Sequence, residues 1–314
     1  MQIVKPDINI DFVGKRKLAM IISGILILIG LASLVVKGGP NYGIDFAGGT
    51  LVQVKFQETT KAARIKDALK QLDLGSIIVQ QFGDQPNEFL IKAQNTSDEL
   101  ESLSQTVKTT LEKSYGEGKV DLRRAEMVGP QVGKDLRQKG LMAVVWAIVG
   151  ILIYITWRFE FRFGMGALVA TVHDVLITLG AFSLFNKEID LPIIAAFLAI
   201  IGYSLNDTII VCDRIRENMG KHSKDGLPSI INRSINETLS RTILTSGTTL
   251  LVVFSLFVFG GGVIHNFAFA MLVGILIGTY SSIFVASPVI LLWEERKGKG
   301  GQTAAATSGG GKNR

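Results

Sequence analysis

Six apolar runs constrain this chain more than any other feature, because each has about the length that spans a bilayer, roughly 17–25 residues. Helices of soluble proteins show a polar face at the 3.6-residue period, and these runs mostly lack one. We therefore predict a polytopic α-helical membrane protein with six transmembrane helices, at Leu18–Val36, Leu141–Trp157, Met165–Phe185, Leu191–Val211, Thr242–Gly262 and Ala268–Leu292.

The first run follows three basic residues, as the apolar part of a cleaved signal peptide would. Signal peptides have a shorter apolar region, about 7–15 residues, and a small-residue cleavage site, of which no convincing example follows this run. We interpret residues 18–36 as a retained first helix.

Basic residues are distributed unevenly between the two sides of these helices. They precede the first helix, separate the second from the third and the fourth from the fifth, and follow the sixth, whereas the opposite short loops contain only Lys187. The positive-inside rule then places both termini in the cytoplasm. We expect a cytoplasmic N-terminus (1–17), a cytoplasmic loop (212–241) and a flexible cytoplasmic tail (294–314). The net charge of +6 is then a topology signal, and we expect no nucleic-acid partner.

Residues 38–139 form an extracytoplasmic insertion long enough for a small domain, and residues 140–293 contain the other five helices. Alternating patterns and turn-rich joints predict strands in TLVQVKF, SIIVQQF, EFLIKAQ and KVDLRRAEM. Helical spacing predicts one helix around Ala62–Leu72 and another around Leu100–Leu111. The order βαββαβ is the α+β ferredoxin-like arrangement. Many unrelated functions use that fold, so it indicates no activity.

Patterns typical of soluble enzymes are absent. The histidines and the single cysteine, Cys212, are scattered without metal-ligand spacing. The glycine clusters do not fit a phosphate-binding loop that opens a helix. We therefore expect a protein that is not an enzyme, has no ATPase motif and needs no metal or cofactor, so that its work draws on another energy source.

Small residues recur at every fourth position of the sixth helix, a pattern that permits close helix–helix contact with or without movement. The fourth helix offers small residues that could face this stripe. The positions concerned are Ala270, Gly274, Gly278, Ser282 and Ala286 on the sixth helix and Gly202, Ser204 and Thr208 on the fourth.

Joints rich in glycine and proline connect the insertion to the first two helices. Such joints absorb backbone rotation at a hinge or serve as tight turns. The residues in question are Gly48, Gly49, Gly129 and Pro130.

Asp207, beside Asn206, interrupts the fourth apolar run about 9 Å inside its cytoplasmic boundary at 1.5 Å per residue. Placing a carboxylate in hydrocarbon costs roughly a few kcal/mol or more, so the group must pair with a cation, become protonated or contact water. Arg241 opens the fifth helix, where it either pairs with Asp207, directly or through water, or anchors the helix at the interface.

His173 and Asp174 lie near the middle of the third helix. One such polar site is explained by a packing hydrogen bond. Two acidic sites on separate helices favour an ion or proton path, so we take Asp174, Asp207 and Arg241 as candidate proton-relay residues, with His173 and Asn206 as supporting polar groups.

Five motifs resemble the signatures of the SecD/SecF family of bacterial protein-export subunits, on its SecF side. They are NYGIDFAGGT, VGPQVG, VHDVLITLGAFSLF, IGYSLNDTIIVCDRIRE and NRSINETLSRTILTSGTTLL. The resemblance covers nearly the whole chain apart from its first few residues and its tail. SecD and SecF belong to the proton-driven resistance–nodulation–division superfamily, whose members pair two six-helix halves.

The resemblance implies a multi-pass protein of the bacterial inner membrane that pairs with SecD. The implied partners are the SecYEG channel, YajC, YidC and the translocating preprotein, and protons are the implied coupling ion. The family uses the proton-motive force to promote late translocation and release on the outer face. Its functionally critical acid and arginine match Asp207 and Arg241 here.

Two other functions remain compatible with the residues alone. A small-molecule efflux half-transporter has the same spans, although a single outer domain of about a hundred residues leaves little room for a drug-binding cleft. A structural or assembly subunit without ion coupling would tolerate Asp207→Asn, since asparagine keeps hydrogen bonds without titrating.

Overall fold

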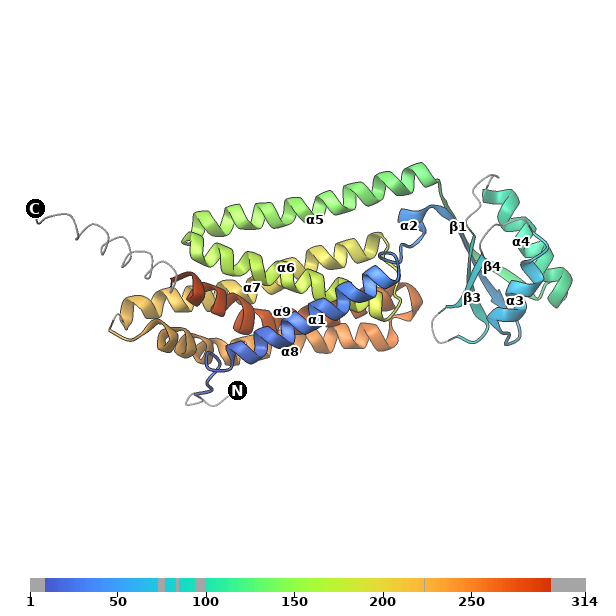
Figure 1. Ribbon diagram of the computed structural model, residues 1–314. Coiled ribbons are helices and arrows are strands. Elements are labelled where there is room, and N and C mark those ends of the chain that lie inside the picture. Colours follow the sequence, from blue (N-terminus) through green and yellow to red (C-terminus); the bar gives the residue numbers. More distant parts are fainter. Residues whose placement is uncertain (1–8, 73–76, 83–84, 94–99, 223, 295–314) are drawn as a thin grey trace, which may run out of the picture.

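The computed structural model describes residues 9–72, 77–82, 85–93, 100–222 and 224–294, so almost all of the predicted tail lies outside the described residues. A bundle of long helices is joined at one end to a small β-sheet domain (Figure 1). The start of the first helix and the end of the last lie at the opposite end of the bundle (Figure 1). This arrangement agrees with an even number of crossings.

Six helices are long and apolar enough to cross a membrane, as predicted. They are α1 (Arg16–Val36), α5 (Pro130–Arg158), α6 (Phe161–Leu184), α7 (Leu191–Lys221), α8 (Leu227–Phe259) and α9 (Gly261–Ser281), the last continued by the π-helix η1 (Ser282–Ala286) and further helix to Glu294.

Several helices extend well beyond the apolar runs. The helix α7 ends at Lys221 and α8 begins at Leu227, so most of the predicted loop 212–241 is helical. Hydropathy marks only the part of a helix that suits lipid, whereas backbone hydrogen bonding continues through polar residues. Pro130 and Pro228 lie in the first turns of α5 and α8, where a fixed φ favours the helix and the missing N–H has no cost.

Glycines bring the helices into close contact at two crossings. A Cβ at Gly30 of α1 would lie 2.8 Å from the Cα of Gly180 in α6. A Cβ at Gly278 of α9 would lie 2.9 Å from the Cβ of Ser204 in α7. The small-residue stripe of the last helix is therefore used inside this chain. Gly202 takes no part in it, because a Cβ there would meet no atom within 4 Å.

Beyond the bundle lies a four-stranded antiparallel sheet with the strand order β2-β3-β1-β4. The element order is the predicted β-α-β-β-α-β, and the two helices cover the sheet face that points away from the bundle (Figure 1). Apolar side chains of this face, such as Val54 and Phe89, pack against Ile65 and Leu111. The elements are β1 (Gly49–Phe56), α3 (Ala62–Leu69), β2 (Ile77–Gln81), β3 (Glu88–Ala93), α4 (Leu100–Tyr115) and β4 (Val120–Val128).

The two connections of this domain to the bundle touch each other. A short helix that the sequence did not indicate, α2 (Ile44–Ala47), leads to Gly48, whose φ of +76° suits glycine. A Cβ at Gly48 would lie 2.9 Å from the Cα of Pro130, the first residue of α5, and Gly129 caps that helix. Gly49 begins β1 and pairs with Val128. The two chain connections thus lie against each other, a geometry that suits the predicted hinge.

We expect Gly30→Ala to destabilise the bundle and Gly24→Ala, on the same helix, to leave it unchanged or stabilise it. The first substitution inserts a methyl group against the backbone of Gly180, whereas a Cβ at Gly24 meets no atom within 4 Å. Overpacking costs about 1–3 kcal/mol, while Gly→Ala in an unobstructed helix gains roughly 0.5–1 kcal/mol. Measured in one detergent, the apparent melting temperature should fall for Gly30→Ala and stay the same or rise for Gly24→Ala. Equal shifts in the two variants would contradict this packing.

Candidate functional site

Asp174 of α6 is the centre of a buried polar cluster. Its Oδ2 accepts hydrogen bonds from Ser204 of α7 at 2.5 Å and from Ser281 of α9 at 2.8 Å. Its Oδ1 lies 2.9 Å from Nδ1 of His173. The side chain of Asp174 is only 1% exposed, so its carboxylate depends on these three partners rather than on solvent.

The cluster reaches the first helix through His173. Its Nε2 lies 3.0 Å from Oγ of Ser23 in α1, and its ring stacks on Tyr280 of α9 with the ring centroids 6.2 Å apart. The Tyr280 hydroxyl accepts a hydrogen bond from Ser23 and donates one to the carbonyl of Ala19. Side chains from α1, α6, α7 and α9 therefore meet in one network.

A π-helical turn begins beside this network. The segment η1 starts directly after Ser281, and Ser287 donates to the carbonyl of Ser282 five residues earlier at 3.2 Å. Isolated π turns are rare and are frequently located at functional sites. The last helix is thus irregular at the point where it contacts the buried carboxylate, and Ser282, predicted as a packing residue, is fully buried there.

Asp207 lies on α7 three residues after Ser204 and is also 1% exposed, but its surroundings differ. Its Oδ2 accepts one hydrogen bond, from Ser246 of α8 at 3.2 Å, and Ser246 in turn accepts one from Thr279 of α9 at 2.8 Å. Its Oδ1 has no hydrogen-bond partner in the described part of the chain, and neither has Oγ1 of Thr242, one turn before Ser246 on α8. The carboxylate is therefore incompletely satisfied.

Arg241 begins the apolar part of α8 and is exposed. Asp207 takes no hydrogen bond from it among the described residues. The arginine lies five residues before Ser246, about 7.5 Å along the helix axis. The structure thus places Asp207 and Arg241 on neighbouring helices, close in level but not in direct contact.

Asn206 lies on a different face of α7 from Asp207. Its side chain is exposed at the surface of the bundle, and so is Gly202, one turn earlier. An amide on a surface of apolar helices is unfavourable in lipid, so this face of α7 is better suited to contact another protein.

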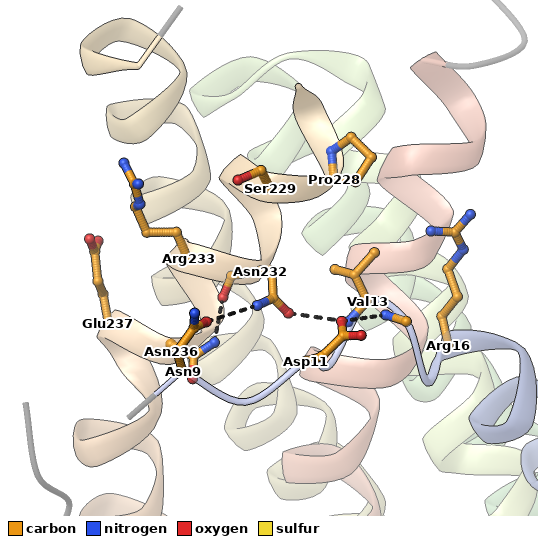
Figure 2. A pocket seen from close by; sticks show the side chains of 11 residues that line it. Asn9, Asp11, Val13, Arg16, Pro228, Ser229, Asn232, Arg233, Asn236 and Glu237 are labelled. Carbon is orange, nitrogen blue, oxygen red and sulfur yellow. Dashed lines mark hydrogen bonds between the residues drawn. The ribbon is translucent and has the colours of Figure 1, made fainter. Parts of the chain in front are cut away.

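A non-helical segment near the N-terminus, residues 9–14, crosses the start of α8 and ends in a turn (Figure 2). Oδ1 of Asn236 accepts from the amide of Ile10 at 2.9 Å, and Oδ1 of Asn232 accepts from that of Phe12 at 2.8 Å. Both asparagines donate to the carbonyl of Ile10. The ring of Phe12 is buried against Phe284. These contacts hold the start of α8, the helix that carries Arg241.

Two cavities lie at opposite ends of the bundle. One, of about 690 Å³, lies beside residues 9–14 and is lined by polar groups of both charges, among them Arg16, Arg233 and Glu237 (Figure 2). The other, of about 660 Å³, separates the sheet from the end of the bundle that faces it. An ion pair between Lys92 of β3 and Glu188, in the loop before α7, bridges this second cavity.

No group of three or more metal-ligating side chains occurs in the described ranges. The chemistry that the site offers is that of carboxylates, hydroxyls and one imidazole, which hold or exchange protons. The sequence did not indicate the partners Ser23, Ser246 and Thr279. Serine and threonine in apolar helices commonly bond to a carbonyl of their own helix, so their presence alone predicts no contact between helices.

Two family models match the chain. The model described as "Protein export membrane protein SecD/SecF, C-terminal" matches residues 106–296, more than half of the chain, and "SecD/SecF GG Motif" matches residues 32–60. The chain belongs to the SecD/SecF family. The first match contains Asp174, Asp207 and Arg241, and the second contains Gly48 and Gly49.

Relatives within the SecD/SecF family support this assignment. A protein translocase subunit SecF from Calditerrivibrio nitroreducens is 48% identical over 295 residues, which are 93% of this chain and 96% of the relative. Another from Desulfurispirillum indicum is 50% identical over 294 residues, 91% of this chain and 92% of the relative. The resemblance inferred from the motifs is confirmed.

Solved SecDF structures share the fold. A crystal structure of SecDF, a translocon-associated membrane protein from Thermus, matches 93% of this chain with a TM-score of 0.84 and 36% identity. A crystal structure of SecDF in a "Super-membrane-facing form" matches 97% with a TM-score of 0.70. The chain spans only 40% and 41% of those longer chains.

We expect Ser204→Ala and Ser281→Ala each to destabilise the bundle, because each removes a hydrogen bond to the buried carboxylate of Asp174. A loss of this kind costs about 1–3 kcal/mol. Ser255→Ala is the matched control, since Ser255 is exposed and donates only to the carbonyl of Leu251 in its own helix. Apparent melting temperatures in one detergent test this. Both variants melting like the control would show that Asp174 does not depend on these hydroxyls.

Proposed function

We propose that this chain is a subunit of the Sec protein-export machinery that works with SecD. In this proposal it uses the proton-motive force to promote late preprotein translocation and release on the outer face of the membrane. The relatives' names support a role in protein translocation. The observation that carries the proton coupling is the buried, incompletely satisfied carboxylate of Asp207, with Arg241 near it on the neighbouring helix.

Protonation of Asp207 would switch a buried charge on α7. Ionised, the carboxylate attracts Arg241 and accepts from Ser246. Protonated, it loses that attraction and packs as a neutral group, so α7 and α8 rotate or separate. A change in one contact is sufficient for such a rearrangement when two packings of the helices differ by only a few kcal/mol, roughly.

Asp174 has a second role in the proposal. Its carboxylate already has three hydrogen-bond partners, so it organises the helices while Asp207 exchanges the proton. Ser204 connects the two sites, because it donates to Asp174 and lies on α7 about 4.5 Å along the axis from Asp207. We propose that protons from outside pass Asp174, beside His173, before they reach Asp207.

The proposed location is the bacterial inner membrane, with both termini in the cytoplasm. The asymmetry of Lys and Arg between loops supports this orientation. So does the placement of the sheet domain at the end of the bundle opposite to the start of α1 (Figure 1). The sheet domain then lies outside, where an exported polypeptide emerges.

The proposed partner is SecD, and the exposed face of α7 is the proposed contact. Pairing of two related halves places the transport site at their interface. Gly202 and Asn206 lie on that face, whereas the stripe of α9 is already buried inside this chain. SecYEG, with YajC and YidC, is the proposed docking site for the pair.

Asp207→Asn is expected to keep fold and assembly but to abolish the stimulation of preprotein export by an imposed proton gradient. Asparagine keeps a hydrogen-bonding group and cannot titrate. The matched control is Asp213→Asn, the same change six residues further on the same helix at an exposed position. The measurement is export into vesicles with SecD and SecYEG at matched levels.

Arg241→Lys extends this experiment, since lysine keeps the charge and loses the fork of donors. We expect a partial to severe loss of gradient-driven export. Stimulation of the Asp207→Asn variant at the wild-type level would refute the proton switch and favour an assembly subunit without ion coupling.

Cysteines at Gly202 and Asn206 are expected to crosslink to SecD, because this face of α7 is exposed in the single chain. Ile153→Cys is the control, an exposed position on α5. The native Cys212 is buried, so it does not compete for the reagent. Equal crosslinking from α5, or purification of a stable chain that conducts protons alone, would contradict the proposed interface.

A further inference from the structure

The short helix α2, through which the chain enters the outer domain, is attached to the first turn of α7. Oδ2 of Asp45 in α2 accepts a hydrogen bond from the amide of Leu191, the first residue of α7, at 3.0 Å. Backbone bonds reinforce the attachment. The amide of Gly43 donates to the carbonyl of Ile189, and the amide of Ile189 donates to that of Asn41, both at 2.8 Å.

A second carboxylate occupies the same helix end. Asp190 is the N-cap of α7, and its Oδ1 accepts from the amide of Ile193 at 3.2 Å. The first amides of a helix have no partners within the helix, and the helix dipole attracts negative charge there. Asp190 belongs to the loop before α7, whereas Asp45 belongs to the root of the outer domain. The N-terminal end of α7 thus holds both carboxylates.

We propose that Asp45 and Asp190 form a coupling joint that transmits movement of α7 to the outer domain. Both are positioning residues. The cause of the movement of α7 is the protonation of Asp207 proposed above, so this inference rests on the proposed function. The helix is 31 residues long and continuous, so it can act as a rigid rod. Asp207 lies sixteen residues from Leu191, about 24 Å along the axis. A shift at the carboxylate therefore reaches the joint through the helix itself.

The outer domain has a second attachment close to the joint. Lys92 on the open face of the sheet pairs with Glu188, two residues before Asp190, and Gln80 donates to the same glutamate at 3.4 Å. The two chain connections cross at Gly48 and Pro130, on the side of α5. The domain is thus held to the end of α7 at one point and to α5 at another. Movement of α7 relative to α5 would tilt it.

The charge of Asp190 gives the joint a dependence on external pH. Burial, with the like charges of Asp45 and Glu188, raises the pKa of Asp190 to about 6, although the bond from Ile193 opposes the shift. A raised pKa means that the contribution of Asp190 to stability is full below about pH 4 and is lost as the pH rises through about 6. An acidic exterior therefore tightens the joint. The other charged or titratable groups around the same cavity are Lys92, Arg124, Glu126, Lys187 and His265.

The test uses the full chain with SecD in proteoliposomes, with one label at Glu117 in the outer domain and one at Val36, at the end of α1. Both side chains are exposed. We expect the label distance to change in the wild type when a proton gradient is imposed. Asp45→Ala should retain proton flux and lose this distance change, whereas Asp45→Asn, which keeps an acceptor, should retain both. Asp67→Ala, at an exposed carboxylate of α3, is the control.

Hydrogen exchange shows whether the joint itself opens. Asp45→Ala should speed exchange at the amide of Leu191 by about tenfold, because the acceptor is lost. Exchange at Leu191 and Ile193 should vary with external pH around 6 in the wild type. It should be constant over that range in Asp190→Asn, which keeps the cap and removes the charge.

The outcomes separate this proposal from the function on which it rests. Wild-type movement that persists in Asp45→Ala would overturn the joint and leave the proton-driven function intact. A pH dependence of exchange that persists in Asp190→Asn would overturn the role of that charge. Absence of any gradient-driven distance change in the wild type would overturn both the joint and the proposed coupling to outer-domain movement.

Discussion

Burial of carboxylates among apolar helices is the constraint on which the rest of the structure depends. A carboxylate that leaves water must receive hydrogen bonds from its new neighbours, and few backbone donors are available between helices that bond internally. Asp174 obtains its donors from α6, α7 and α9, and His173 extends the network to α1. The glycine contacts at Gly30 and Gly278 bring these helices near enough for short hydroxyl side chains to reach. Close packing of the helices and hydrogen bonding of the buried carboxylate therefore depend on each other.

The carboxylate of Asp207, in contrast, receives only part of the hydrogen bonding that burial requires. Asp207 has a single donor, and a buried oxygen of Thr242 nearby also has no partner in the described residues. Buried polar groups without a partner are few in folded proteins and need an explanation, and the proton exchange proposed for Asp207 is one. The fully bonded carboxylate lies on α6 and the under-bonded one on α7, and Ser204 of α7 donates to the first of them. The rigid organisation around Asp174 therefore provides the frame against which a change at Asp207 can act.

The helix α7 also connects the interior of the bundle to the sheet domain. The helix α7 carries Ser204 and Asp207 within the bundle and receives Asp45 and Asp190 at its outer end. The sheet domain is otherwise connected through two chain segments that touch at Gly48. The sheet domain is therefore held at this crossing of the two segments and at its contacts with the end of α7. The proposed coupling uses this arrangement, because α7 carries Asp207 and also contacts Asp45 at the root of the sheet domain.

The sequence by itself determined the six spans, the order of strands and helices in the outer domain, the family and the two intramembrane carboxylates. These properties depend on local periodicity, on apolar length and on the cost of charge in lipid, all of which are written in neighbouring residues. Only the tertiary structure decided that Asp174 is satisfied while Asp207 is not, that Gly278 packs inward while Gly202 faces outward, and that Asp45 accepts a hydrogen bond from the first amide of α7. Such contacts join residues far apart in the chain. Serine, glycine and aspartate are compatible with several local roles, and only the packing of helices against one another selects among them.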